Sequence, residues 1–328
     1  MKPISVAIVG ATGLVGSTFI KVLEERKVPI SSLTLFASHK TAGQTKSFNG
    51  ELHKVRELNS ESLETNFDAV LFSAGGQISK DYAYQAVASG SVVIDNSSAW
   101  RMDDHVPLIV PEVNASHLSK HQGLIANPNC STIQSVVALA PIHQTYGLKR
   151  IVYTTYQAVS GSGYSGLNDL ARAKNNESQE FYPVPIDRVV YPKIDEFLDN
   201  YVTKEEQKMI NETKKILGDE SISISATCVR VGIEHSHSVS IVCQTTKPFE
   251  LADVIQLLKH APSVKVYDHP LIPTVLDATG NDLVHIGRIR RDDSVENGLQ
   301  LWVVSDNIRK GAATNAVQIL ETILGENV

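Results

Sequence analysis

The segment SVAIVGATGLVG, residues 5–16, constrains the fold more than any other part of the chain. Residues 5–9 are a continuous apolar run rich in β-branched side chains, which predicts a strand buried on both faces. A turn with Gly10, Gly13 and Gly16 follows, and apolar residues then recur at helical spacing. This order is a variant of the dinucleotide-binding fingerprint, in which the N-terminus of the helix faces a pyrophosphate. An ordinary tight turn between a strand and a helix is the alternative.

The end of the next expected strand, residues 33–38, bears on the type of dinucleotide. An NAD-selective site would place Asp or Glu there, but the sequence reads ASHKTAG at 37–43. Ser38, Lys40 and Thr41 offer hydroxyl groups and a positive charge, which suit a 2′-phosphate. The sequence therefore favours NADP over NAD, although Lys40 by itself is equally well read as a solvated surface charge.

Two kinds of sheet are expected along the chain. Short apolar runs at 68–75, 91–98 and 123–126, with a helical stretch at 79–89 between two of them, indicate a parallel sheet covered on both faces. After residue 130 the expected strands are longer and partly alternating, which indicates a mixed or antiparallel second sheet. These later strands are expected at 150–163, 223–231, 237–246 and 298–306, with a hairpin signal at Asn297-Gly298.

These patterns predict an α/β chain with two domains. The first is a Rossmann-type NADP-binding domain at 1–127, completed by a C-terminal helix within 308–328 whose apolar stripe must pack on something. The second is an α+β catalytic and dimerisation domain at 128–307, with a mixed and largely antiparallel sheet. A chain of 328 residues is long enough for two cores.

Composition excludes several classes of function. The formal net charge of −6 argues against nucleic acid and anionic membranes as general partners. The three cysteines are too few and too scattered for a disulfide framework or a zinc site, so we expect no metal. No stretch approaches the roughly 18 apolar residues of a membrane span. The cytoplasm is the expected location.

Cys130 lies in NPNCST, between a short apolar strand and an apolar helix. A thiol at a helix N-terminus has a lowered pKa, and the backbone N–H groups there can hold an oxyanion. Cysteine is also among the most buried residue types, so an inert core residue is the alternative. We keep that alternative for Cys228 and Cys243, which fall in apolar strand patterns.

A nucleophilic cysteine needs a partner for proton transfer, and CVRVGIEHSHSVSIV offers Arg230, His235 and His237. On one regular strand Arg230 and His237 would point to opposite faces, so a shared pocket requires a break near Gly232. The alternative is that the two histidines lie on a strand face that meets solvent. No third ligand is evident for a metal.

Together these segments resemble the aspartate-β-semialdehyde dehydrogenase family. The similar segments include GATGLVG, ASHKTAG, DNSSAWRMD, IANPNCST, YQAVSGSG, EEQK, CVRVGIEHSHS and DNIRKGAATNA, in the family's order over essentially the whole chain. The compact length is similar to the Gram-positive-type branch. The resemblance implies NADPH-dependent reductive dephosphorylation of L-aspartyl-4-phosphate to L-aspartate-4-semialdehyde, in amino-acid biosynthesis. It also implies a homodimer.

The resemblance also implies roles for individual residues. Cys130 would form a thioester, His237 would be the general acid/base, and Gln157 would orient the acyl group. Arg230 would bind the substrate α-carboxylate, a task suited to its planar fork, and Glu205 the amino group. Contacts to phosphate are implied for Arg101, Asn129 and Lys208, and contacts to NADP for Thr12, Gly13, Ser38, Lys40, Ser160, Gly161 and Asn307.

Alternatives to these roles follow from the residues alone. Glu205 and Lys208 have the i,i+3 spacing of an ion pair on a helix surface. Gln157 could simply make a hydrogen bond at the end of a strand, and Arg101 could be a surface charge. His235 is a rival base. Lys40 stands where the family usually has Arg. The expected preference for NADP over NAD is therefore weaker, because Lys cannot make bidentate contacts to a phosphate.

Two other activities share this architecture or chemistry. The nucleophile segment of an N-acetyl-glutamyl-phosphate reductase usually reads NPGCY, whereas this chain has Asn129 before the cysteine. The nucleophile segment of glyceraldehyde-3-phosphate dehydrogenase, SCTTN, is absent from this chain. A non-catalytic NADP-binding protein is the alternative from a different class.

Overall fold

The computed structural model describes residues 3–325, which form two units. One unit contains residues up to Pro128 together with the chain from Ala312 onward, and the other contains Asn129–Gly311. Each unit has its own sheet. The chain passes from the first unit to the second between Pro128 and Asn129, and it returns between Gly311 and Ala312. Cys130, the first residue of a helix, lies next to the first of these boundaries.

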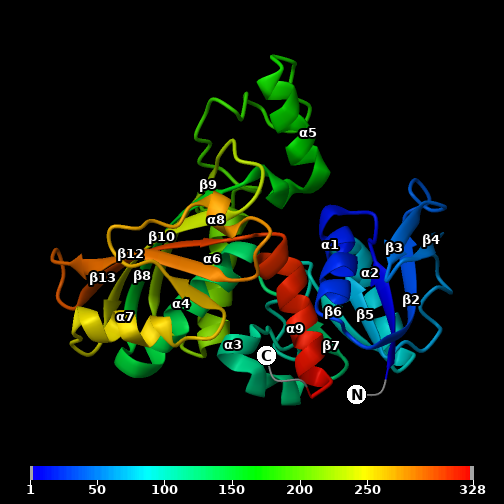
Figure 1. The fold of residues 1–328 in the computed structure, drawn as a ribbon, viewed down its shortest axis with the longest axis horizontal. Coiled ribbons are helices and arrows are strands. Elements are labelled where there is room, and N and C mark those ends of the chain that lie inside the picture. Colours follow the sequence, from blue (N-terminus) through cyan, green and yellow to red (C-terminus); the bar gives the residue numbers. More distant parts are fainter. Residues whose placement is uncertain (1–2, 326–328) are drawn as a thin grey trace. The chain divides into compact units, whose positions relative to one another are not determined.

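The first unit is built on a seven-stranded sheet with the order β3-β4-β2-β1-β5-β6-β7 (Figure 1). Strands β1, β2, β4, β5, β6 and β7 run parallel, while β3 pairs antiparallel with β4. The expected parallel sheet is confirmed. The strands are β1 (Ile4–Val9), β2 (Ile30–Ala37), β3 (Thr45–Phe48), β4 (Glu51–Glu57), β5 (Ala69–Phe72), β6 (Val92–Asp95) and β7 (Leu124–Ala126).

The β3–β4 hairpin is a feature that the sequence pattern did not predict. Its strands carry mostly polar side chains, and only Phe48 and Val55 are buried. A hairpin with so few apolar residues lacks the alternation that identifies a half-buried strand. It extends the sheet beyond β2 and brings Glu57 beside Ala37 at the carboxyl ends of the strands.

Helices cover the first sheet and complete its core. Helix α1 (Leu14–Glu25) and helix α9 (Thr314–Ile323) share one apolar core with the strands, in which Phe19, Leu23, Val317 and Leu320 are buried. The stripe of the C-terminal helix thus packs within this unit. The other helical segments here are α2 (Gly76–Ala88), α3 (Pro111–Asn114) and η1 (Ala115–Lys120).

The second unit is built on a six-stranded sheet with the order β11-β12-β13-β10-β8-β9. Three pairings are antiparallel and two are parallel, so the expected mixed, largely antiparallel sheet is confirmed. Its strands are β8 (Leu148–Gln157), β9 (Ser223–Arg230), β10 (His237–Thr245), β11 (Val264–Val266), β12 (Val284–Asp292) and β13 (Gly298–Ser305). Hairpin pairing of β12 with β13 is present, with a five-residue connection that ends at Asn297 in a left-handed conformation.

Helices α4 and α7 pack on this sheet, and α6 packs on α4 and β9. Side chains on the opposite face, such as Thr154, Tyr156, Val242 and Trp302, are half-buried. The helices are α4 (Cys130–Tyr146), α5 (Gly163–Lys174), α6 (Lys204–Leu217), α7 (Leu251–Lys259) and α8 (Val275–Ala278), with short segments η2 (Val159–Ser162) and η3 (Arg309–Ala313). Within residues 3–325, no helix combines the length and the apolar character needed to cross a membrane.

Candidate functional site

The glycine-rich turn lies between β1 and α1, as the sequence predicts. Gly10 has a φ of +87°, and a Cβ there would lie 2.7 Å from the Ser73 carbonyl oxygen, so the position requires glycine. A Cβ on Gly16 would lie 2.1 Å from the Gly10 carbonyl oxygen. Both constraints hold the turn close to its neighbours, and among residues 3–325 no side chain caps the N-terminus of α1 at Gly13. This is the local structure that a bound pyrophosphate needs.

A cavity of about 440 Å³ opens at the carboxyl ends of β1, β2 and β5. The expected residues Gly10, Thr12, Gly13 and Ser38 line it, and the Thr12 and Thr41 hydroxyl oxygens are 2.9 Å apart beside it. The remaining lining residues come from strand ends and from α2. They are Val9, Ala37, His39, Glu57, Leu58, Ser73, Ala74, Ile78 and Tyr82.

The charged residues around this cavity differ from the sequence prediction. Lys40 is exposed and is not among the lining residues, whereas Glu57 is. A carboxylate accepts hydrogen bonds from ribose hydroxyls and repels a 2′-phosphate. Glu57 was missed because it follows the unpredicted strand β4 and not the strand after the glycine turn. Its place beside Ala37 could have been found only from the β2–β4 pairing.

Arg101 belongs to the first unit and is 8% exposed, so it is not the surface charge that its residue type suggests. Its Nε donates to the Asn127 carbonyl oxygen at 2.9 Å and its Nη2 to the Asn96 carbonyl oxygen at 2.9 Å. These bonds hold the side chain against the segment that leads to Cys130.

Cys130 is the first residue of α4 and is half-buried. Asn129 is the N-cap, and its side-chain oxygen accepts from the Ser131 and Thr132 backbone N–H groups at 3.0 and 3.2 Å. These two N–H groups are therefore already used by the cap. A Cβ on Gly311 would lie 2.9 Å from the Cys130 Cβ, so the backbone at Gly311 packs directly on the cysteine.

Glu205 connects Asn129 to Gln157 inside the second unit. Its Oε1 accepts from the Asn129 side-chain amide at 2.9 Å and from the Gln157 amide at 3.0 Å, while Oε2 accepts from Lys208 Nζ at 3.2 Å. Glu205 is 5% exposed. The pair with Lys208 is therefore part of a buried network and not an isolated surface pair. Gln157 at the end of β8 is likewise buried.

The charge of Glu205 is stabilised by this network. Burial favours the neutral acid, but the Lys208 charge and the Gln157 and Asn129 amides outweigh it and lower the pKa of Glu205 to about 2. Lys208 is also held by Asp195 at 2.8 Å.

A second buried carboxylate, Glu212, supports the same cap. Its Oε2 accepts from the Asn129 backbone N–H at 2.6 Å. Sequence reasoning missed Glu212, although its spacing of seven residues from Glu205 places both on one face of α6.

Arg230 and His237 meet at the end of β8 from two different strands. Arg230 is the last residue of β9 and donates from Nη1 to the Ala158 carbonyl oxygen at 2.6 Å. His237 is the first residue of β10, and its Nδ1 accepts from the Ala158 N–H at 3.0 Å. The break that the sequence required is thus a complete change of strand, with β8 between the two.

The segment between them is held by backbone hydrogen bonds. The Val231 N–H donates to the Gln157 carbonyl oxygen, and the Val159 and Ser160 N–H groups donate to carbonyl oxygens of residues 233 and 234. A Cβ on Gly232 would lie 2.6 Å from the Ile186 carbonyl oxygen, so close packing accounts for glycine there.

The environment of His237 favours a neutral ring. Complete burial, together with the nearby Arg230 charge, lowers the pKa of His237 to about 3. Because Nδ1 accepts the Ala158 N–H, the proton of the neutral ring lies on Nε2. Among residues 3–325 this Nε2 has no hydrogen-bond partner. His235 is only half-buried and lies outside this contact.

Three residues with expected cofactor contacts cluster in the second unit. Asn307 donates from its amide to the Ser160 hydroxyl at 3.0 Å and accepts from the Ser236 N–H at 2.9 Å. A Cβ on Gly161 would lie 2.9 Å from Arg230 Nη1 and 3.5 Å from His237 Nε2. A side chain at position 161 would therefore crowd both groups.

The other two cysteines are inert by comparison. Burial raises the pKa of Cys228 well above its usual range and that of Cys243 to about 12, so neither forms a thiolate near neutral pH.

Comparison with known families defines the class of protein that this fold and site represent. Residues 5–121 match the family described as semialdehyde dehydrogenase, NAD binding domain, and residues 139–310 match semialdehyde dehydrogenase, dimerisation domain. The chain is 49% identical to aspartate-semialdehyde dehydrogenase of Aquifex aeolicus, over 98% of each chain. The chain belongs to the aspartate-semialdehyde dehydrogenase family.

Solved structures agree with this assignment. Aspartate semialdehyde dehydrogenase II of Vibrio cholerae, complexed with ASA, has a TM-score of 0.96 and 42% identity, over 100% of each chain. The aspartate semialdehyde dehydrogenase of Candida albicans with NADP has a TM-score of 0.77 and 26% identity, over 98% of this chain and 99% of that one. The expected oxidoreductase class and fold are confirmed.

Proposed function

We propose that this chain reduces L-aspartyl-4-phosphate to L-aspartate-4-semialdehyde and phosphate, in the biosynthesis of aspartate-derived amino acids. The observation that carries the proposal is the buried network in which Glu205 joins the N-cap of the Cys130 helix to Gln157. A helix that carried an inert cysteine would not need a buried carboxylate and a buried amide organised at its N-cap. The relatives that match nearly the whole chain are named aspartate-semialdehyde dehydrogenases, which supports the same substrate, aspartate semialdehyde, for this chain.

The proposed reaction begins with attack by the Cys130 sulfur on the acyl carbon. The carbon–sulfur bond forms, the bond from the acyl carbon to the phosphate oxygen breaks, and phosphate leaves, so that a thioester remains on Cys130. Reduction adds a hydride to the thioester carbon and a proton to its oxygen, which gives a thiohemiacetal. The hydroxyl group then gives up its proton as the carbon–sulfur bond breaks, which releases the aldehyde and leaves the sulfur of Cys130 free. NADPH supplies the hydride when it is bound.

His237 serves in this proposal as the acid/base group, and in its neutral form it acts as a hydrogen-bond donor. Its Nε2–H is available to the carbonyl oxygen that gains charge in the tetrahedral states, and the Ala158 N–H fixes the ring in the tautomer that donates. The lowered pKa supports donation from a neutral ring. Burial beside Arg230 and Gly161 favours His237 over His235. Gln157, held by Glu205, orients the acyl group.

Substrate recognition is proposed for the charged residues of the network. Arg230 pairs with the α-carboxylate and Glu205, ionised because its pKa is about 2, receives the amino group. Lys208, Asn129 and Arg101 hold the phosphate. The Asn129 amide already donates to Glu205, so its phosphate contact uses its second amide hydrogen.

NADP is the proposed cofactor, bound by the domain at 1–127 with the C-terminal helix. The 440 Å³ cavity and the open start of α1 fit a dinucleotide. Ser38 supports the 2′-phosphate, with Lys40 and Thr41 beside it, while Glu57 opposes it. The preference for NADP is therefore proposed to be modest.

The chemistry and the dimer contact are proposed for residues 128–307. The match to a dimerisation domain fits a homodimer, and the half-buried sheet face with Tyr156 and Trp302 suits a partner subunit. We propose the cytoplasm as the location of the reaction, because the cysteine content suits a reducing compartment.

A phosphate-dependent assay tests this function. Purified protein, aspartate semialdehyde and phosphate are mixed with NADP or NAD, and the reduced nicotinamide is followed by absorbance. We expect turnover that requires phosphate, is lost in Cys130→Ala, and is kept in the matched control Cys243→Ala. N-acetyl-glutamate semialdehyde should be a poor substrate. Binding of NADP without any turnover would instead indicate the non-catalytic alternative.

A further inference from the structure

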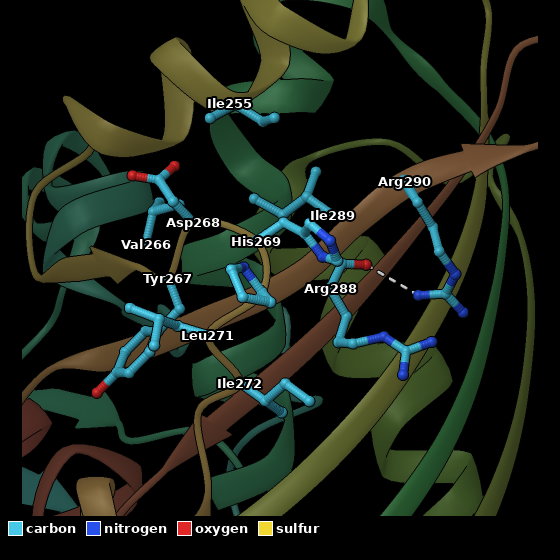
Figure 2. Close-up of a pocket in the computed structure, with 11 residues that line it drawn as sticks. Ile255, Val266, Tyr267, Asp268, His269, Leu271, Ile272, Arg288, Ile289 and Arg290 are labelled. Carbon is cyan, nitrogen blue, oxygen red and sulfur yellow. Dashed lines mark hydrogen bonds between the residues drawn. The ribbon is translucent and has the colours of Figure 1, made fainter.

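A second cavity of about 530 Å³ lies in the second unit, between β12 and the segment from Tyr267 to Ile272 (Figure 2). Helix α7 contributes Ile255 to it, and none of the residues proposed for the reaction line it. Its lining is mostly apolar, with two arginines, a histidine and an aspartate. The lining residues are Ile255, Val266, Tyr267, Asp268, His269, Pro270, Leu271, Ile272, Arg288, Ile289 and Arg290.

A bulge in β12 presents the arginines to this cavity. The β12–β13 register shifts between Gly287 and Arg290, so Arg288 and Ile289 fall outside the ladder. Arg288 has a φ of +52°, a left-handed conformation that costs free energy in a residue with a side chain. Bulges of this kind redirect side chains. Figure 2 shows the Arg288 and Arg290 side chains on the same side of the cavity.

The cavity lining contains two arginines and one carboxylate, Asp268, and Asp292 lies close enough to Arg290 to interact with its charge. Arg290 donates to the Arg288 carbonyl oxygen at 2.8 Å and to the Gln300 side chain, both neutral acceptors. Within residues 3–325 the Arg288 guanidinium has no hydrogen-bond or ion-pair partner. Asp268, the acidic residue of the lining, is paired with Lys259 at 2.8 Å. Two like charges held close together favour binding of an anion.

The apolar lining indicates the rest of the ligand. Leu271 and Ile272 are 65% and 52% exposed, which leaves apolar surface open beside the arginines. Cavities of roughly 300–1,000 Å³ with apolar walls and a few polar groups are typical of small-molecule sites. We propose that this cavity binds a small molecule with one anionic group, a carboxylate or a phosphate, joined to an aliphatic or aromatic body. The guanidinium fork recognises both anions, and the body packs on Ile255 and Ile272.

Methyl NMR on the full-length protein tests this site. Protein labelled at isoleucine methyl groups is titrated with phenylacetate, with phenyl phosphate, and with the neutral phenylacetamide as a matched probe. We expect saturable shifts at Ile255, Ile272 and Ile289 with one or both anions at millimolar concentration, and much weaker shifts with the amide. The stronger anion identifies whether carboxylate or phosphate is preferred.

Two variants separate this site from anion binding elsewhere. Arg288→Gln should weaken binding at these isoleucines by about tenfold, whereas Arg150→Gln, which removes an exposed arginine outside the cavity, should leave the affinity unchanged. The proposal is overturned if wild-type protein shows no shifts at the three isoleucines, if the amide binds as well as the anions, or if Arg288→Gln binds normally.

Discussion

Replacing Glu205 with Gln removes the charge at the centre of the buried network while keeping nearly the same shape. The pKa of Glu205 is lowered from 4.5 to about 2 in the folded protein. A shift of one unit corresponds to about 1.4 kcal/mol, so the folded state favours the ionised form by about 3 kcal/mol. We expect Glu205→Gln to lower the free energy of unfolding by about that amount at neutral pH.

The pH dependence gives this prediction a distinct signature. Because the folded-state pKa is depressed, the stabilisation is present above the unfolded-state pKa of 4.5 and is lost as the pH falls toward 2. The difference between wild type and variant should therefore be constant from about pH 7 to about pH 5, and roughly 1 kcal/mol smaller near pH 3.5.

Urea unfolding followed by fluorescence measures this difference. Trp302 lies in the second unit and Trp100 in the first, so a Trp100→Phe background makes Trp302 the reporter of the unit that contains Glu205. Glu180→Gln, which removes an exposed partner of Arg172, is the control and should change stability by no more than about 0.5 kcal/mol. A Glu205→Gln variant as stable as wild type at neutral pH would refute the network argument.

Three further predictions concern the reaction. Gly161→Ala should lower kcat by roughly tenfold or more, because its Cβ would crowd Arg230 and His237; unchanged steady-state kinetics would contradict this contact. Glu57→Gln should raise the ratio of kcat/KM for NADP to kcat/KM for NAD by several-fold, because it removes a charge that repels the 2′-phosphate. An unchanged ratio would show that Glu57 does not contact the bound cofactor. His237 should stay neutral down to about pH 4, because its pKa is about 3. An NMR titration of nitrogen-labelled histidine with a midpoint near 6.5 for this ring would contradict the lowered pKa.

Much of the fold could be predicted from the sequence because its signals are local. Continuous apolar runs and the glycine turn identify β1, β5 and β6, and partial alternation identifies β10 and β13. The β3–β4 hairpin could not be predicted, since its polar strands are stabilised by pairing with β2 and not by a pattern of their own.

The sequence suggested candidate residues for the site one by one, but it did not show how they are connected. The junction of a strand and a helix pointed to Cys130, and the family's spacing from Arg230 pointed to His237. No local pattern shows that Ala158 joins His237 to Arg230, because the three belong to different strands or loops of one sheet. Lys40 and Glu57 illustrate the same limit, since only strand pairing shows which of them borders the cavity.

A single-turnover experiment tests the central claim, acyl transfer to Cys130, most directly. Aspartate semialdehyde and NADP are added to the protein without phosphate, so that oxidation stops at the acyl-enzyme. We expect a burst of about one NADPH per active site and an aspartyl adduct that peptide mass spectrometry locates on Cys130. Added phosphate should release this adduct. A burst that persists in Cys130→Ala, or an adduct on another residue, would rule out acyl transfer to Cys130.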